Sequence, residues 1–175
     1  MRLAAGSVCL AFGASGCGYA LAGRGTFLPA DIKTVGIPPI ENKTTFYRTE
    51  QILTDKVRSE FIGRGKYKIL PDAAGADAVL TAELASIIVQ PAALSANQLA
   101  SRYLFTVVIR AKFTDARNNE VLWSNDQLVF REEYELSAAP GTVEGTTFLD
   151  TQSTAFDRIS TDIARTVVTA ILEAF

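Results

Sequence analysis

Alternating apolar and polar positions predict the strand at the centre of the fold. From Tyr103 to Thr114, one set of alternate side chains is apolar, and the other set mixes Leu, Thr, Val, Arg and Lys. A period of two places the two sets on opposite faces of a strand. We expect neighbouring strands over 78–89 and 121–136. The second should contain a bulge near Asn125-Asp126, because strands of that length seldom run unbroken.

Two further segments carry apolar residues at helical spacing. In residues 48–62 and again in residues 149–174, apolar side chains recur at every third or fourth position, as at Leu53 and Phe61. This spacing gives each helix one apolar face. Thr49 is the expected N-cap of the first helix, since its hydroxyl can accept a hydrogen bond from the first turn.

Short apolar runs over 32–37 and 67–70 predict two more strands, each ended by proline. Residues 41–45 are polar and predict a turn. The expected order is strand, helix, four strands, helix. We therefore predict an α+β fold in which two helices pack on one face of a mostly antiparallel sheet of four strands or slightly more.

The first residues have the layout of a secretory signal. Arg2 supplies a positive charge, an apolar stretch follows, and small residues precede Cys17. The stretch is too short to span a bilayer, which takes about 20 apolar residues. No later stretch reaches that length. The predicted organisation is a signal peptide over 1–16, a tether over 17–31 and one domain over 32–175.

The segment Ala14-Ser15-Gly16-Cys17 resembles a bacterial lipobox, in which a peptidase cuts before the cysteine and acyl chains are attached to it. Ala14 departs from the pattern, since leucine is usual there. The alternative is an ordinary secretory signal that contains a cysteine. By resemblance to the known sorting rule, in which aspartate after the cysteine retains a lipoprotein in the inner membrane, Gly18 allows passage to the outer membrane.

Composition excludes several classes of function. The chain has 17 Lys and Arg against 19 Asp and Glu, a balance that does not suggest a nucleic-acid binder. It has no histidine, which removes Ser-His-Asp and Cys-His catalysis and most zinc sites. Both cysteines lie within the first 17 residues, so no disulfide is expected inside the domain. No phosphate-binding loop or metal motif is present, so we expect no enzyme activity, cofactor or metal.

The less apolar face of the central strand is the candidate binding surface. Simple pairing across the turn after Asp115 would place Lys112 near Trp123. The predicted site residues are Arg102, Arg110, Lys112, Trp123 and Arg131. Such a surface could bind phosphates while apolar neighbours meet acyl chains. It could equally be a solvated face with ordinary cross-strand charge pairs, or it could bury against a protein partner.

Taken together, these segments resemble the LptE family, the outer-membrane lipopolysaccharide-assembly lipoproteins. The resemblance rests on an ordered set of short motifs: Cys17-Gly18-Tyr19-Ala20-Leu21, Leu28-Pro29, Ile32-Lys33-Thr34-Val35-Gly36-Ile37-Pro38, Glu41-Asn42-Lys43-Thr44, Glu50 with Leu53-Thr54 and Val57, Glu60-Phe61, Arg64-Gly65, Ala76-Asp77-Ala78-Val79-Leu80, and the closing helix. It implies two helices on a four-stranded sheet and a non-enzymatic protein. It also implies a plug inside the β-barrel protein LptD that helps the barrel assemble and binds lipopolysaccharide.

Three other readings compete with this one. An outer-membrane lipoprotein of another envelope machine, such as a peptidoglycan-synthase activator or a secretion-channel subunit, could share this build. A free carrier of small ligands should have an apolar pocket and work without a barrel. An enzyme would need a convergent carboxylate or Ser-Lys site, and none is evident in the sequence.

Overall fold

The computed structural model describes residues 28–64, 66–94, 100–135 and 145–175. The predicted signal peptide, the lipid-attachment residue Cys17 and most of the predicted tether lie outside the described residues. The helices and strands in chain order are β1 (Thr34–Gly36), β2 (Glu41–Asn42), α1 (Thr49–Gly63), β3 (Lys68–Leu70), β4 (Ala78–Leu94), β5 (Ala100–Asp115), β6 (Val121–Glu135) and α2 (Gly145–Leu172).

The sheet is larger than predicted and mixed in direction. In the described part of the chain its strands follow the order β3-β1-β4-β5-β6, and β2 pairs with β4 beside this path. The long strands β4, β5 and β6 are antiparallel, whereas β1 runs parallel to both β3 and β4. The expectation of a mostly antiparallel four-stranded sheet is therefore wrong in part. The chain passes through α1 between β1 and β3, and such a crossover returns the chain in the same direction.

The segment predicted as a polar turn also contributes to the sheet. Glu41 and Asn42 form the short strand β2, which pairs in parallel with Glu83 and Leu84 of β4. The prediction of a turn over 41–45 is wrong for these two residues, because pairing with a distant strand satisfies the backbone of a polar segment as well as a turn would. It holds just after them, where Asn42 Oδ1 accepts a hydrogen bond from the Thr44 N–H at 2.8 Å.

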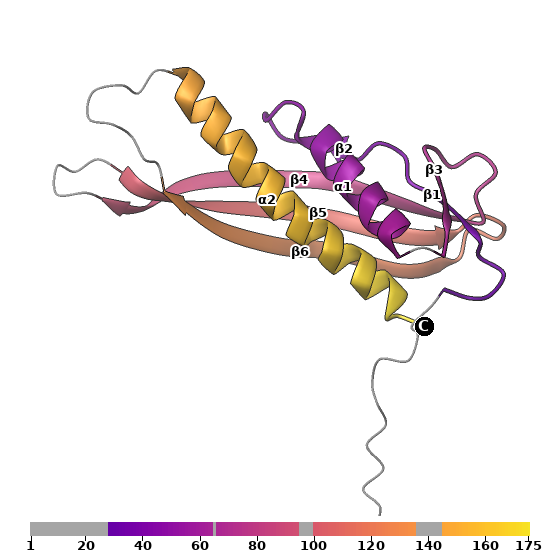
Figure 1. Ribbon diagram of the computed structural model, residues 1–175. Helices are drawn as coiled ribbons and strands as arrows, with labels where there is room; N and C mark the ends of the chain where they lie inside the picture. Colours follow the sequence, from indigo (N-terminus) through magenta and orange to yellow (C-terminus); the bar gives the residue numbers. More distant parts are fainter. Residues whose placement is uncertain (1–27, 65, 95–99, 136–144) are drawn as a thin grey trace, which may run out of the picture.

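Both helices cover one face of the sheet (Figure 1). They lie side by side and run in the same direction. Lys56 Nζ is 2.9 Å from a carboxylate oxygen of Asp157, and Arg64 donates to the Thr169 hydroxyl at 2.8 Å. These two contacts join α1 and α2 at two points along their length.

Alternate residues of β5 form the floor of the core, as the period of two predicted. The buried side chains under the helices are Phe105, Val107, Ile109, Ala111 and Phe113. The apolar faces of the helices close the core from above; their buried members include Leu53, Val57, Phe61, Phe156, Ile159, Ile163, Val167 and Ile171. The apolar faces predicted from helical spacing and from strand alternation thus pack against each other in one core.

Helix α1 begins differently from the expectation. Arg48, not Thr49, is the N-cap; its φ is 68°, in the left-handed region, and no side chain of the described residues caps the helix. The Thr49 hydroxyl instead donates to the Phe46 carbonyl at 2.8 Å. Asn42 donates to that carbonyl at 2.8 Å and to Glu50 Oε2 at 2.7 Å. These bonds define the turn before the helix starts and draw Thr49 away from the capping position.

The bulge predicted in the last strand is confirmed. Ile109 pairs with Leu128, but Ala111 pairs with Asn125, so β6 has one residue more than β5 over this stretch. A second irregularity lies nearer the hairpin, between the pairs Phe113–Trp123 and Thr114–Val121. Each irregularity shifts the residues of β6 on its hairpin side by one position relative to β5.

Candidate functional site

The face of β4, β5 and β6 turned away from the helices is called here the outer face. Because the odd-numbered residues of β5 from Phe105 to Phe113 are buried under the helices, the even-numbered ones from Leu104 to Lys112 lie on the outer face. Leu104 and Val108 are half-buried there, and Arg110 and Lys112 are exposed. This matches the predicted division of the strand into two faces.

Trp123 does not belong to the outer face. It pairs with Phe113, a core residue, and packs against the core, whereas Lys112 pairs with Ser124. The expectation that Lys112 lies near Trp123 is therefore wrong. The irregularity next to Thr114 shifts the register by one residue, and a one-residue shift moves a side chain to the opposite face.

The cations at the hairpin end of the outer face lie among acids. Arg110 forms an ion pair with Glu83 on β4, with Nη1 and Oε1 2.5 Å apart. Arg110, Lys112, Glu41, Glu83 and Asp126 line a shallow depression of about 210 Å³. Among the described residues Lys112 forms no ion pair. The local charge is thus mixed, and Lys112 is the cation left available.

The other two predicted cations lie further along the sheet. Arg102 is 3.8 Å from Glu133 on β6. Arg131 pairs with Thr106 in the β5–β6 register, is exposed, and has no ion pair among the described residues. Lys112 and Thr106 are six residues apart on β5, or about 20 Å at the rise of a strand. Lys112 and Arg131 therefore cannot hold the same phosphate.

Apolar side chains occupy the middle of the outer face, between the levels of Arg102 and Lys112 on β5. Val108 pairs with Val129 on β6, and Thr106 pairs with Ile88 on β4. Ile88 is 46% exposed and Val129 is 38% exposed. We call Ile88, Leu104, Val108 and Val129 the apolar strip. A strip of branched side chains flanked by cations suits contact with a protein or with an amphiphilic lipid.

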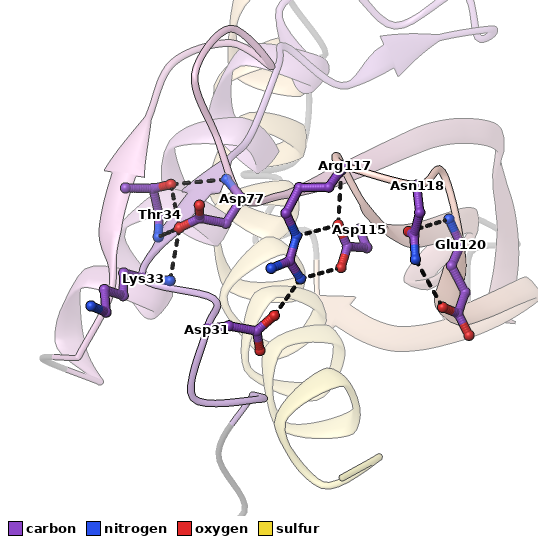
Figure 2. A network of polar contacts seen from close by, with 8 residues as sticks. All are labelled: Asp31, Lys33, Thr34, Asp77, Asp115, Arg117, Asn118 and Glu120. Carbon is purple, nitrogen blue, oxygen red and sulfur yellow. Dashed lines mark hydrogen bonds and ion pairs between the residues drawn. The ribbon is translucent and has the colours of Figure 1, made fainter.

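A second polar arrangement lies at the end of the sheet where β1, β4 and the β5–β6 hairpin meet (Figure 2). Asp77 Oδ2 accepts hydrogen bonds from the backbone N–H groups of Lys33 and Thr34 at 2.9 and 2.8 Å, and from the Thr34 hydroxyl at 2.8 Å. These bonds lower the pKa of Asp77, the backbone bond from Lys33 most of all. One carboxylate therefore fixes the start of β1 against β4.

The hairpin continues this arrangement. Asp115 Oδ1 accepts from the backbone N–H of Arg117 at 2.8 Å and from its Nε at 3.0 Å. Arg117 also forms an ion pair with Asp31, ahead of β1. The Arg117 side chain holds the pKa of Asp115 down at about 2, and Asp115 in turn raises the pKa of Arg117. We call Asp31, Lys33, Thr34, Asp77, Asp115 and Arg117 the polar clasp.

The polar clasp was not predicted from the sequence, in which the residues after Asp115 indicated only a turn. An available signal was an aspartate at a strand end with an arginine two residues later, which can form a turn held by the carboxylate. The partners Asp31 and Asp77 lie 84 and 38 residues before Asp115 in the chain. Only the fold brings them together.

The described residues contain no cluster of three or more side chains suited to holding a metal ion. No helix within the described ranges is long and apolar enough to cross a membrane. The outer face itself offers charge pairing at separated points and burial of the apolar strip.

Comparisons with solved structures identify related folds. Uncharacterized lipoprotein B from Nitrosomonas europaea aligns with a TM-score of 0.52 and 16% identity, over 89% of this chain and 88% of that one. A protein from Xanthomonas campestris aligns with a TM-score of 0.56 and 12% identity, over 85% and 90%. PelC from Paraburkholderia phytofirmans, a dodecamer, aligns with a TM-score of 0.52 and 12% identity, over 80% and 89%. At these identities the likeness concerns the fold alone.

Comparison with sequences gives the family. No curated protein matches the chain. The model of the LptE family, described as lipopolysaccharide-assembly, matches residues 32–171. That span takes in every helix and strand described above apart from the last residue of α2. The chain therefore belongs to the LptE family of lipopolysaccharide-assembly lipoproteins.

Proposed function

We propose that this chain is an outer-membrane lipoprotein, anchored by acyl chains on Cys17, that plugs an LptD-type barrel and supports its assembly. In this proposal it also binds lipopolysaccharide on its way to the cell surface. The observation that carries the proposal is the family match over residues 32–171. The family is non-enzymatic, so the role we assign is binding and assembly.

The tether limits how the domain can sit on the membrane. Leu28 is buried, and its backbone N–H donates to the Tyr67 hydroxyl at 3.0 Å, so the chain is held from this residue on. Leu28 lies eleven positions after Cys17 in the chain. Even fully extended, this segment reaches only about 40 Å. A lipid on Cys17 would therefore keep the polar clasp end near the periplasmic face of the membrane.

The outer face supports contact with both partners. Burial of the apolar strip against a barrel wall or against acyl chains would remove exposed branched side chains from water, which is favourable. Of the predicted site residues, Lys112 and Arg131 are the better candidates for lipid phosphates. Arg110 is a weaker candidate because Glu83 already pairs with it. Trp123 lies on the other face and cannot join them.

A pull-down of the tagged chain from solubilised outer membrane tests the main partner. The proposal expects a stoichiometric β-barrel of LptD type, identified by mass. Recovery of a peptidoglycan synthase or a secretion-channel subunit instead would contradict it. The chain would then be the adaptor of another envelope machine, and the outer face would be its protein interface.

A charge-reversal pair tests the lipid contacts. We expect Lys112→Glu with Arg131→Glu to weaken lipopolysaccharide binding by roughly tenfold, since two attractive contacts become repulsive. The matched control is Lys68→Glu with Arg165→Glu, which changes the net charge equally at exposed positions on β3 and α2, outside β4, β5 and β6. Equal binding by the two folded double variants would remove the outer face from the proposal.

Substitution of Cys17 tests the anchor. We expect Cys17→Ala to release the protein from the membrane when the barrel partner is absent, because no acyl chain can then be attached. Fractionation with and without the barrel separates the two sources of attachment. Retention without the barrel would show that something other than lipid holds the chain.

A further inference from the structure

A cavity of about 740 Å³ opens at the N-terminal end of α1, between α1, α2 and β5. Its floor consists of aromatic rings from three parts of the chain. Phe105 of β5 lies 6.3 Å from Phe46 and 6.3 Å from Phe156 of α2, measured between ring centroids. Ile52 of α1 forms part of the wall. The floor is therefore apolar, and Thr45, Thr49 and Gln51 add polar groups to the lining.

The rim of the cavity has features that the core does not require. Tyr47 lines the cavity, and yet 91% of it is exposed. Arg48, the next residue, has a φ of 68°. Arginine adopts this left-handed backbone at an energetic cost, and such strain concentrates at binding sites. Arg48 forms no ion pair with another residue in the part of the chain that the structure describes.

Size and chemistry together define the ligand. Pockets for small ligands have volumes of about 300–1,000 Å³, an apolar lining and a few polar groups that orient the ligand. This cavity has that volume, an aromatic floor and one unpaired cation at its rim; Asp55 also lies on the rim. We propose that the cavity binds one acyl chain of an anionic lipid, with the chain on the aromatic floor and the acidic headgroup beside Arg48.

The source of the chain can be lipopolysaccharide or a free fatty acid. The assignment of the cavity to an acyl chain of lipopolysaccharide rests on the proposed function. The chemistry of the cavity itself requires only an alkyl chain next to an acid. This site differs from the outer face, because it opens on the helix side of the sheet.

Binding of cis-parinaric acid, a fluorescent fatty acid, tests the proposal. The protein is the mature chain with Cys17→Ser, which leaves every described residue unchanged. We expect saturable binding, displaced by dodecanoate. Displacement by lipid A as well would identify lipopolysaccharide as a source, and displacement by dodecanoate alone would limit the site to free fatty acids. No saturable binding would overturn the proposal.

Two tryptophan substitutions on α1 form a matched pair. Ile52→Trp fills the cavity and should weaken binding of the probe about tenfold or more, the effect of losing burial of about two methylene groups. Ile62→Trp, at the other end of α1 where Ile62 is 61% exposed, should leave binding unchanged. Circular dichroism and thermal unfolding check that both variants fold. Equal affinities in the two variants would contradict the assignment.

The rim charges give a second, independent readout. We expect Arg48→Gln to weaken binding of the acid up to about fivefold, the range of an exposed ion pair. Asp55→Asn, which removes the acid from the same rim, should not weaken it. The barrel pull-down with Ile52→Trp separates the two proposals: loss of the probe with the barrel retained would leave the proposed function intact.

Discussion

The polar clasp and the rim of the cavity differ in how completely their charged groups are paired. At the polar clasp end, Asp77 and Asp115 each accept several hydrogen bonds, and Arg117 joins two acids. At the cavity end, Arg48 is strained and unpaired among the described residues, Tyr47 is exposed, and space remains above three aromatic rings. The contrast indicates that the clasp end serves stability, whereas the cavity end holds a conformation that stability alone does not favour.

The largest effect is expected from crowding the clasp end. A Cβ at Gly36 would lie 2.3 Å from the Asp72 carbonyl oxygen and 3.0 Å from the Ala76 Cβ. Gly36→Ala should therefore lower the free energy of unfolding by about 1–3 kcal/mol, the usual cost of overpacking. Urea unfolding measures it. Gly63→Ala is the control, since a Cβ there meets nothing within 4 Å. Equal stability of the two variants would mean that the β1 segment tolerates rearrangement.

The next effect concerns the pH dependence of the clasp. The pKa of Asp115 is about 2 in the folded protein, below its ordinary 3.8, so its ionised form stabilises the fold. This contribution is complete above about pH 4 and is lost as the pH falls towards 2. Asp115→Asn should lower the urea midpoint at pH 7 and reduce its fall between pH 4 and 2. Asp162→Asn, an exposed position on α2, is the control. An unchanged profile in Asp115→Asn would show that the clasp does not stabilise the fold.

The smallest effect is expected at the cavity end and has the opposite sign. Arg48→Gly should raise the free energy of unfolding by up to about 1 kcal/mol, because glycine adopts a positive φ without the steric penalty. Arg48→Ala keeps that penalty and should not stabilise. Urea unfolding of both variants, together with the fatty-acid titration, checks the comparison. A stabilised Arg48→Gly that binds the probe more weakly would show that strain and binding share this residue. Loss of stability in Arg48→Gly would mean that the left-handed turn is not strained.

Prediction from the sequence succeeded where the signal was local. The division of β5 into a buried set and an outer set follows from its own alternation, and the bulge near Asn125 follows from strand length. The apolar faces of both helices were also correct. Prediction failed for β2, which forms only because the distant strand β4 lies beside it. It also failed at the start of α1, where a nearby acceptor, the Phe46 carbonyl, draws the Thr49 hydroxyl from the cap.

The candidate site divides in the same way. The sequence places Arg110 and Lys112 on one face, and the structure agrees. It could not predict that Glu83 would pair with Arg110, since that contact depends on the register between β4 and β5. It could not place Trp123 either, because one extra residue in β6 moves this side chain to the core.

The sequence by itself determined which side chains of the two helices and of β5 face the core, because burial follows the fixed periods of helix and strand. It also contained the family pattern. Only the tertiary structure decided the parallel pairing of β1, the assembly of the polar clasp from three segments, and the cavity over Phe46, Phe105 and Phe156. These features depend on register and on residues far apart in the chain, and no local period specifies either.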